Sequence, residues 1–165
     1  AEFPSADIAE SIFEWIKSRV SFHSDESRGS ELGLLADQTL VEVLIRPADL
    51  VIMRESAGCR RMGDCDDFSM LAASMLLAAG RPACFVTVAA DPSSPERFSH
   101  VYVETVDVHG RRMPLDCSHG SYPRWEVGDF RPVYRTQKWP VDSAIPAILL
   151  GLGLLAAYKY KLWRM

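Results

Sequence analysis

The chain has 165 residues, the length of one compact domain with at most a short appendage. Hydrophobic residues make up 48% of it and charged residues 24%, which is ordinary globular usage and excludes disorder, collagen and coiled coil. The formal net charge is −4 and no basic patch alternates with aromatic residues, so we do not expect a nucleic-acid partner.

The first half of the chain carries helical patterns. Apolar residues at helical spacing predict an amphipathic first helix, with Ser5 as its N-cap and Asp7 placed favourably for the helix dipole. The last of the helices is strongly apolar, and Gly80 fits the C′ position just after it. The predicted helices cover residues 6–20, 48–55 and 65–79, together with a short helix that carries residues 40–44 and stops near Arg46-Pro47; loops are predicted over 22–33 and 58–63.

After Pro82 the hydrophobic period changes from 3.6 to 2, which indicates β-strands. The predicted strands cover residues 83–89, 99–106 and 111–117. His109 and Gly110 form a candidate hairpin turn between the second and the third strand, whereas residues 118–142 are predicted to be irregular. Helices followed by antiparallel strands predict an α+β fold.

The C-terminal segment differs from the rest in charge and hydropathy. Residues 143–165 hold three basic residues and no acidic one, and residues 143–158 are an uncharged, apolar run of 16 residues. As a helix this run spans about 24 Å, short of a hydrocarbon core of about 30 Å, and extension to Trp163 reaches about 31 Å. We therefore divide the chain into a domain over residues 1–142 and an apolar helix over residues 143–165. That helix either anchors the protein to a membrane or a partner subunit, or packs on the domain.

Four cysteines are present, and they are too few and too widely spaced for a disulfide scaffold. They are Cys59, Cys65, Cys84 and Cys117. No signal peptide is visible at the start of the chain, which lacks a basic region followed by an apolar run. These features predict free thiols in a reducing, cytoplasmic compartment.

The most informative motif is Gly63-Asp64-Cys65-Asp66-Asp67. It places a thiol in the first turn of a predicted helix, after a glycine that lets the backbone turn sharply. The positive end of the helix dipole favours thiolate over thiol, and free N–H groups there are suited to hold a developing oxyanion. Because Asp66 and Asp67 oppose the thiolate, a nearby imidazolium is needed. We therefore expect Cys65 to be a nucleophile that acts with a histidine.

The expected partners of Cys65 lie on two consecutive strands. His100 is near the start of one predicted strand, and Asp116 is near the end of the next. Antiparallel pairing of these strands brings the imidazole and the carboxylate side by side, so that the carboxylate orients the base. His119 and His23 are rival histidines, and His119 is the weaker partner because it lies in a predicted loop.

Zinc binding is an alternative use of these residues. Cys65, His100, Asp116 and Cys117 are ligand types that suit zinc. No close pair such as CxxC or HxxxH supports this site, so we expect neither a metal nor another cofactor. Cys84 is predicted to be a core residue, and Cys117 is either an ordinary thiol or a redox modulator of Cys65.

Three segments together resemble the transglutaminase-like superfamily. They are residues 63–69 (GDCDDFS), residues 98–104 (FSHVYVE) and residues 114–116 (PLD). The resemblance covers residues 6–135 in general layout and residues 63–117 in detail. It implies a papain-like core, in the small single-domain form familiar from bacteria and phages. Together with the free thiols, the lack of a visible signal peptide and the apolar segment 143–165, this predicts a cytoplasmic, virion-associated or membrane-associated protein.

The resemblance also implies roles for individual residues: Cys65 as the nucleophile, His100 as the base and Asp116 as the residue that orients it. Family members usually have proline after the aspartate, where this chain has Cys117. No residue of this chain matches the family's side-chain donor of the oxyanion hole, for which Gln38 is the one candidate considered. The chain has no room for the accessory domains of large animal transglutaminases, so calcium dependence is not expected.

Two functions from different classes follow from these observations. The first is a thiol acyl-transfer enzyme that acts on peptide or glutamine-type amide bonds of a protein or peptide substrate. Hydrolysis by a cysteine protease or amidase is favoured over cross-linking, because water is always present and one small domain offers little surface for a second protein. The second is a non-enzymatic structural or assembly module of the same fold, held by its C-terminal helix.

Overall fold

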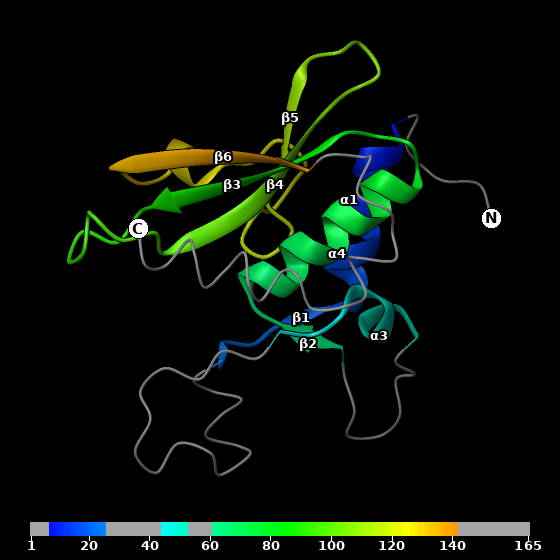
Figure 1. The fold of residues 1–165 in the computed structure, drawn as a ribbon, viewed down its shortest axis with the longest axis horizontal. Coiled ribbons are helices and arrows are strands. Elements are labelled where there is room, and N and C mark those ends of the chain that lie inside the picture. The colour runs from blue at the N-terminus through cyan, green and yellow to red at the C-terminus, as the bar shows by residue number, and fades with distance from the viewer. Residues whose placement is uncertain (1–6, 26–43, 53–60, 142–165) are drawn as a thin grey trace, which may run out of the picture.

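Helix α4 (Cys65–Ala78) packs against a four-stranded antiparallel sheet, which gives the α+β architecture expected from the sequence (Figure 1). The structure is a computed structural model that describes residues 7–25, 44–52 and 61–141. The other elements are α1 (Ile8–Arg19), β1 (Ser21–Phe22), α3 (Pro47–Ile52), β2 (Met62–Gly63), β3 (Ala83–Ala89), β4 (His100–Val106), β5 (Arg112–Leu115), the 3₁₀ turn η1 (Val127–Asp129) and β6 (Arg135–Val141).

The sheet has the strand order β5-β4-β3-β6, and each pair of neighbours is antiparallel. The three strands predicted from the sequence are confirmed. The prediction that residues 118–142 are irregular is wrong for residues 135–141, because β6 pairs with β3 along its whole length. Strand β6 lies at the edge of the sheet and is mostly exposed. An edge strand tolerates polar residues and a proline, and its sequence (RTQKWPV) therefore shows no apolar alternation.

The main hydrophobic core lies between α1, α4 and one face of the sheet. Helix α1 contributes Ile12, Phe13 and Ile16, and these pack with Leu71 of α4 and Val103 of β4. At about 1.5–3 kcal/mol for each fully buried side chain, this packing outweighs any intrinsic helix preference. The amphipathic pattern of the first helix therefore predicts its buried face correctly.

The start of α1 differs from the prediction. The helix begins at Ile8 and its N-cap is Asp7, whose carboxylate accepts a hydrogen bond from the amide of Ala9 at 3.0 Å. The same carboxylate accepts a bond from the amide of Val108, in the turn between β4 and β5. The sequence predicted Ser5 as the N-cap and Asp7 only as a residue that favours the dipole. Ser5 lies outside the described residues, and Asp7 is both the cap and a link between the helix and the β4–β5 turn.

The end of α4 is confirmed in detail. Gly80 has a φ of 71°, in the left-handed region where glycine carries no steric cost. Its amide donates to the carbonyl of Leu77, and the amide of Arg81 donates to the carbonyl of Leu76. This hydrogen-bond pattern is a Schellman motif, which stops the helix and directs the chain into β3.

Two short elements complete the description. Helix α3 was predicted over 48–55; it begins at Pro47, and residues 53–55 lie outside the described residues. The short helix predicted to carry residues 40–44 and to stop near Arg46-Pro47 lies outside the described residues up to residue 43, and residues 44–46 are not helical. Strands β1 and β2 form a parallel pair that the sequence did not predict, because each has only two residues and shows no periodicity.

The predicted C-terminal helix over 143–165 lies outside the described residues. Within residues 7–25, 44–52 and 61–141, no helix has both the length and the apolar character needed to cross a bilayer.

The sequence suggested that Gly63 allows a sharp turn before α4. In the structure Gly63 instead packs closely against the start of this helix. It lies in the short strand β2, and a Cβ atom at this position would be 2.6 Å from Cβ of Asp67. Asp67 is fully buried, and its carboxylate accepts the amide of Ile45 at 2.7 Å. Neither the backbone of Gly63 nor the side chain of Asp67 can therefore move away from a methyl group added at position 63.

We predict that Gly63→Ala lowers the free energy of unfolding by about 1–3 kcal/mol, the usual cost of overpacking a rigid site. Gly128→Ala is the matched control, because its Cβ would meet only Val133 Cγ2 at an ordinary 3.7 Å. Urea unfolding followed by circular dichroism measures both variants. Equal stability of the two variants would contradict this account of Gly63.

Candidate active site

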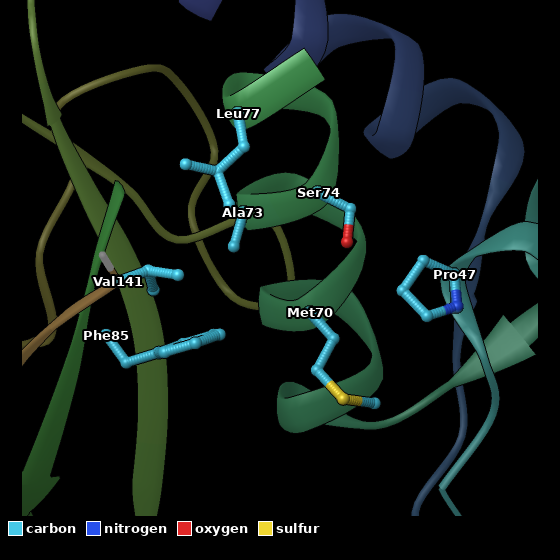
Figure 2. Close-up of a pocket in the computed structure, with 7 residues that line it drawn as sticks. All are labelled: Pro47, Met70, Ala73, Ser74, Leu77, Phe85 and Val141. Atoms are coloured by element: carbon cyan, nitrogen blue, oxygen red, sulfur yellow. The ribbon is translucent and has the colours of Figure 1, made fainter. Parts of the chain in front are cut away.

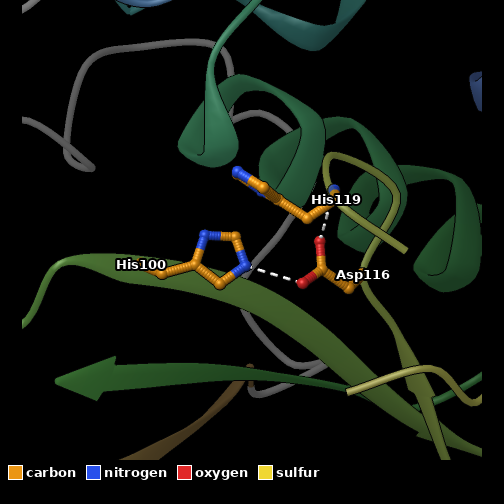
Figure 3. A group of neighbouring side chains, drawn as sticks. All are labelled: His100, Asp116 and His119. Carbon is orange, nitrogen blue, oxygen red and sulfur yellow. Dashed lines mark hydrogen bonds and ion pairs between the residues drawn. The ribbon is translucent and has the colours of Figure 1, made fainter. Parts of the chain in front are cut away.

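The structure brings His100 and Asp116 into direct contact. Nε2 of His100 lies 2.7 Å from Oδ2 of Asp116 (Figure 3), and the two side chains are 8% and 0% exposed. The register explains the contact: Val103 pairs with Leu115, so Asp116 comes next to Tyr102, and His100 lies two residues away on the same face of β4. The expected juxtaposition of these two residues is confirmed.

Asp116 is buried but well supplied with hydrogen-bond donors. Its Oδ1 accepts a bond from the hydroxyl of Ser118 and another from the amide of His119, both at 2.9 Å. Burial raises the pKa of Asp116, but its bonds with His100, His119 and Ser118 together hold the pKa below its ordinary value. The carboxylate is therefore ionised at neutral pH and can only accept hydrogen bonds.

This constraint decides which nitrogen of His100 carries the proton. Because the ionised carboxylate of Asp116 is an acceptor, Nε2 of His100 is the donor. In the neutral ring the lone pair then lies on Nδ1, which Figure 3 shows on the side of the ring turned away from Asp116. His100 is thus oriented as a base.

His119 belongs to the same group, although the sequence ranked it as the weaker partner. Its ring meets His100 edge-on, with centroids 4.6 Å apart at 80°, and it also contacts Phe22 at 5.1 Å. Burial and the nearby His100 lower the pKa of His119, which favours its neutral form. In the sequence, the position of His119 in the CSHG segment after β5 is the one indication of its role, because loop residues show no hydrophobic periodicity.

Cys65 is the first residue of α4 and is half-buried. Two links bring the first turn of α4 to the histidine pair. The hydroxyl of Ser69 lies 2.6 Å from the carbonyl oxygen of Cys65 and 3.1 Å from that of Val101, the neighbour of His100. Ring contacts also run from His119 through Phe22 to Phe68, the latter two with centroids 6.5 Å apart.

These links lie where β4 extends beyond the end of β5. The main core packs on the face of the sheet that carries Val103, whereas Tyr102 belongs to a smaller apolar cluster with Val86 and Val127. His100 shares the face of Tyr102, with rings 6.2 Å apart. The first turn of α4 therefore lies beside the end of β4 that carries the His100–Asp116 pair (Figure 3).

The sequence predicted that free amides at the start of α4 could hold an oxyanion, but in the structure an acidic side chain accepts hydrogen bonds from two of them. Asp64 is the N-cap, and its Oδ1 accepts bonds from the amides of Asp66 and Asp67 at 3.2 and 3.5 Å. These amides are therefore occupied and do not serve an oxyanion. The sulfur of Cys65 lies 3.6 Å from Oδ1 of Asp66, so its immediate surroundings are acidic.

The zinc set considered from the sequence does not assemble. Cys117 is 3% exposed and packs in the main core, while its neighbour Asp116 turns to the site. Burial raises the pKa of the Cys117 thiol strongly, which agrees with an ordinary buried thiol and not with the alternative of a redox modulator beside Cys65. Cys84 is half-buried on β3 and packs less completely than predicted, and burial raises the pKa of its thiol.

The remaining predicted residues are His23, Cys59 and Gln38. The amide of His23 donates to the carbonyl of Gly63, two residues before Cys65. His23 places its Nδ1 3.1 Å from the carbonyl oxygen of Phe22. Cys59 and Gln38 lie outside the described residues.

A separate apolar hollow lies between α3, α4 and the sheet (Figure 2). Its lining includes Pro47, Met70, Leu77, Phe85 and Val141, and none of its lining side chains is titratable. Ser74 is the one polar side chain in this lining, and no acidic or basic side chain lines the hollow with it. The chemistry of the described residues is therefore concentrated at His100, Asp116 and His119, beside the start of α4.

Comparison with known proteins yields no relative: no protein-family model, curated protein or solved structure matches the chain. The site is therefore interpreted from its own geometry.

We predict that the neutral rings adopt opposite tautomers, which long-range ¹H–¹⁵N NMR spectra distinguish. His100 should carry its proton on Nε2, because Asp116 accepts it. His119 should carry its proton on Nδ1, because Ser118 gives its only hydroxyl proton to Asp116 and must accept a bond from His119 at 3.0 Å. Ser118→Ala should shift the tautomer ratio of His119 and leave His100 unchanged; a shift at His100 alone would contradict this network.

Proposed function

We propose that this protein is a thiol acyl-transfer enzyme in which Cys65 is the nucleophile, His100 the base and Asp116 the residue that orients the base. The observation that carries the proposal is the His100–Asp116 pair at 2.7 Å, with the first turn of a cysteine-headed helix bonded to the residue beside His100. Nucleophile, base and orienting carboxylate are the three components of a catalytic triad.

In the proposed reaction Nδ1 of His100 takes the thiol proton of Cys65. The sulfur attacks the carbonyl carbon of a peptide or glutamine-type amide, and a tetrahedral intermediate forms. The imidazolium passes its proton to the leaving nitrogen, the C–N bond breaks, and an acyl thioester remains on Cys65. A water molecule, deprotonated by His100, then attacks the thioester, releases the acid and restores the thiol.

The resemblance of residues 63–69, 98–104 and 114–116 to the transglutaminase-like superfamily supports this proposal and a papain-like core. The α+β architecture and the order of nucleophile helix, base strand and aspartate agree with it. Hydrolysis is the favoured outcome, which makes the enzyme a cysteine protease or amidase and a protein or peptide its substrate. An amine in place of water would make it a cross-linking enzyme.

The acidic environment of Cys65 favours a second candidate function. Ligand atoms of Asp64, Cys65 and Asp66 lie within 4.8 Å of one another, and these carboxylates oppose a thiolate. A structural or assembly module would keep the same fold without using its thiol. The reactivity of Cys65 separates this candidate from the enzyme.

We predict that iodoacetamide alkylates Cys65 faster than Cys84 or Cys117, with a pH midpoint below that of a free thiol. Cys84 and Cys117 should react slowly, because burial raises the pKa of both thiols. Mass spectrometry of the alkylated peptides over time gives each rate. His100→Gln should slow the alkylation of Cys65 about 10-fold or more near neutral pH, because the base is lost.

The activity test compares Cys65→Ala with Cys84→Ala, since Cys84 lies on β3 and outside the proposed triad. Ammonia release and peptide cleavage are measured on glutamine-containing peptides, with and without a fluorescent primary amine. Cys65→Ala should abolish turnover and leave the circular dichroism spectrum unchanged. Equal alkylation of the three thiols, or unchanged turnover in Cys65→Ala, would favour the structural module.

A further inference from the structure

The described chain holds a second imidazole whose lone pair is directed by the same carboxylate. Ionised Asp116 accepts from Nε2 of His100 directly and from the hydroxyl of Ser118. Ser118 has no second proton to give, so it accepts from Nδ1 of His119. One carboxylate therefore leaves Nδ1 of His100 and Nε2 of His119 without protons when both rings are neutral.

We propose that His100 and His119 form a binding site for a divalent transition metal ion of the zinc type, with Asp116 as their shared outer partner. Neutral imidazole nitrogens are preferred ligands of such ions. A carboxylate that holds the other nitrogen of a ligating ring is the usual support for them, and here it supports both rings, one directly and one through Ser118.

The geometry of the pair suits such an ion. One possible ligand atom from each of His100, Asp116 and His119 lies within 4.8 Å of the other two. Two ligands of a tetrahedral zinc ion, each about 2.1 Å from it, are about 3.4 Å apart. Figure 3 shows a ring nitrogen of each histidine on the side of the group that faces α4.

The charge near the pair also favours a cation. Asp116 is ionised at the back of the site, and Asp64 and Asp66 add two carboxylates at the start of α4. His119 takes the place of Cys117 as a metal ligand, because Cys117 is buried in the core. The site is thus made of residues on one short stretch, 116–119, and one strand residue across from it.

The consequence for activity rests on the proposed function. If Cys65 faces Nδ1 of His100 as proposed, its thiolate becomes a third ligand of the ion. The metal then occupies the lone pair of the base and the electron pair of the nucleophile, so it inhibits the enzyme. Metal binding by the two histidines does not depend on this step.

The test titrates the metal-free full-length protein with Co²⁺, monitored by absorbance, and with Zn²⁺, monitored by calorimetry. We expect one ion per chain and visible d–d bands of cobalt. His119→Ala and His100→Ala should each weaken binding about 100-fold or more, and Ser118→Ala about 10–100-fold, as loss of an outer partner does. His109→Ala is the matched control: this histidine is exposed in the β4–β5 turn and should change nothing.

Unchanged affinity in both His100→Ala and His119→Ala, or no binding by the wild-type protein, overturns the metal site. A sulfur-to-cobalt charge-transfer band that is absent in Cys65→Ala supports the third ligand. Its absence from the wild-type spectrum overturns the inhibitory step alone. Loss of turnover in Cys65→Ala tests the proposed function separately, because the two histidines should still bind the ion in that variant.

Discussion

The buried carboxylate of Asp116 is the group on which the site depends. It is fully buried, and it accepts hydrogen bonds from His100, Ser118 and the amide of His119. A buried carboxylate without donors would be protonated at neutral pH, and a protonated acid would no longer dictate the proton positions around it. The fold meets this cost with the loop at 116–120, whose Gly120 amide also donates to the carbonyl of Asp116 at 2.8 Å. The same bonds that allow Asp116 to be buried also direct the lone pairs of two imidazoles.

The packing of α4 determines where Cys65 lies. Helix α4 is apolar on nearly every side, because α1 covers one side, α3 another and the sheet a third. Its first turn is fixed more specifically. The Asp64 cap starts the helix, Asp67 fills the space left by Gly63, and Ser69 bridges to the carbonyl of Val101. Such polar contacts within a packed core fix the register of the helix against β4 more sharply than apolar contacts alone, because they fail when the helix shifts by one residue.

The sequence predicted the parts of this structure that rest on strong local signals. Periodicity gave α4, β3 and β4, and the Gly80 signal gave the end of α4. The pairing of His100 with Asp116 followed from the antiparallel arrangement of two consecutive strands. Strand β6 was missed because an edge strand needs no apolar alternation, and its partner β3 lies about fifty residues away in the sequence. His119 was ranked low because its place beside His100 depends on a loop conformation held by Asp116, which no pattern in the sequence reports.

The acidic residues near Cys65 bear on the resting state of the proposed nucleophile. A thiolate–imidazolium pair has no net charge, so a distant carboxylate raises the energy of the thiolate by nearly the amount that it lowers the energy of the imidazolium. The balance is decided by the nearest groups. Asp66 lies 3.6 Å from the sulfur, whereas Asp116 lies 2.7 Å from the imidazole and in a drier environment. The attraction at the imidazole therefore acts over a shorter distance and with less screening than the repulsion from Asp66 at the sulfur, and it opposes that repulsion. Asp116 thus does two things for the proposed chemistry: it orients His100, and it compensates for the carboxylates that begin the helix of its nucleophile.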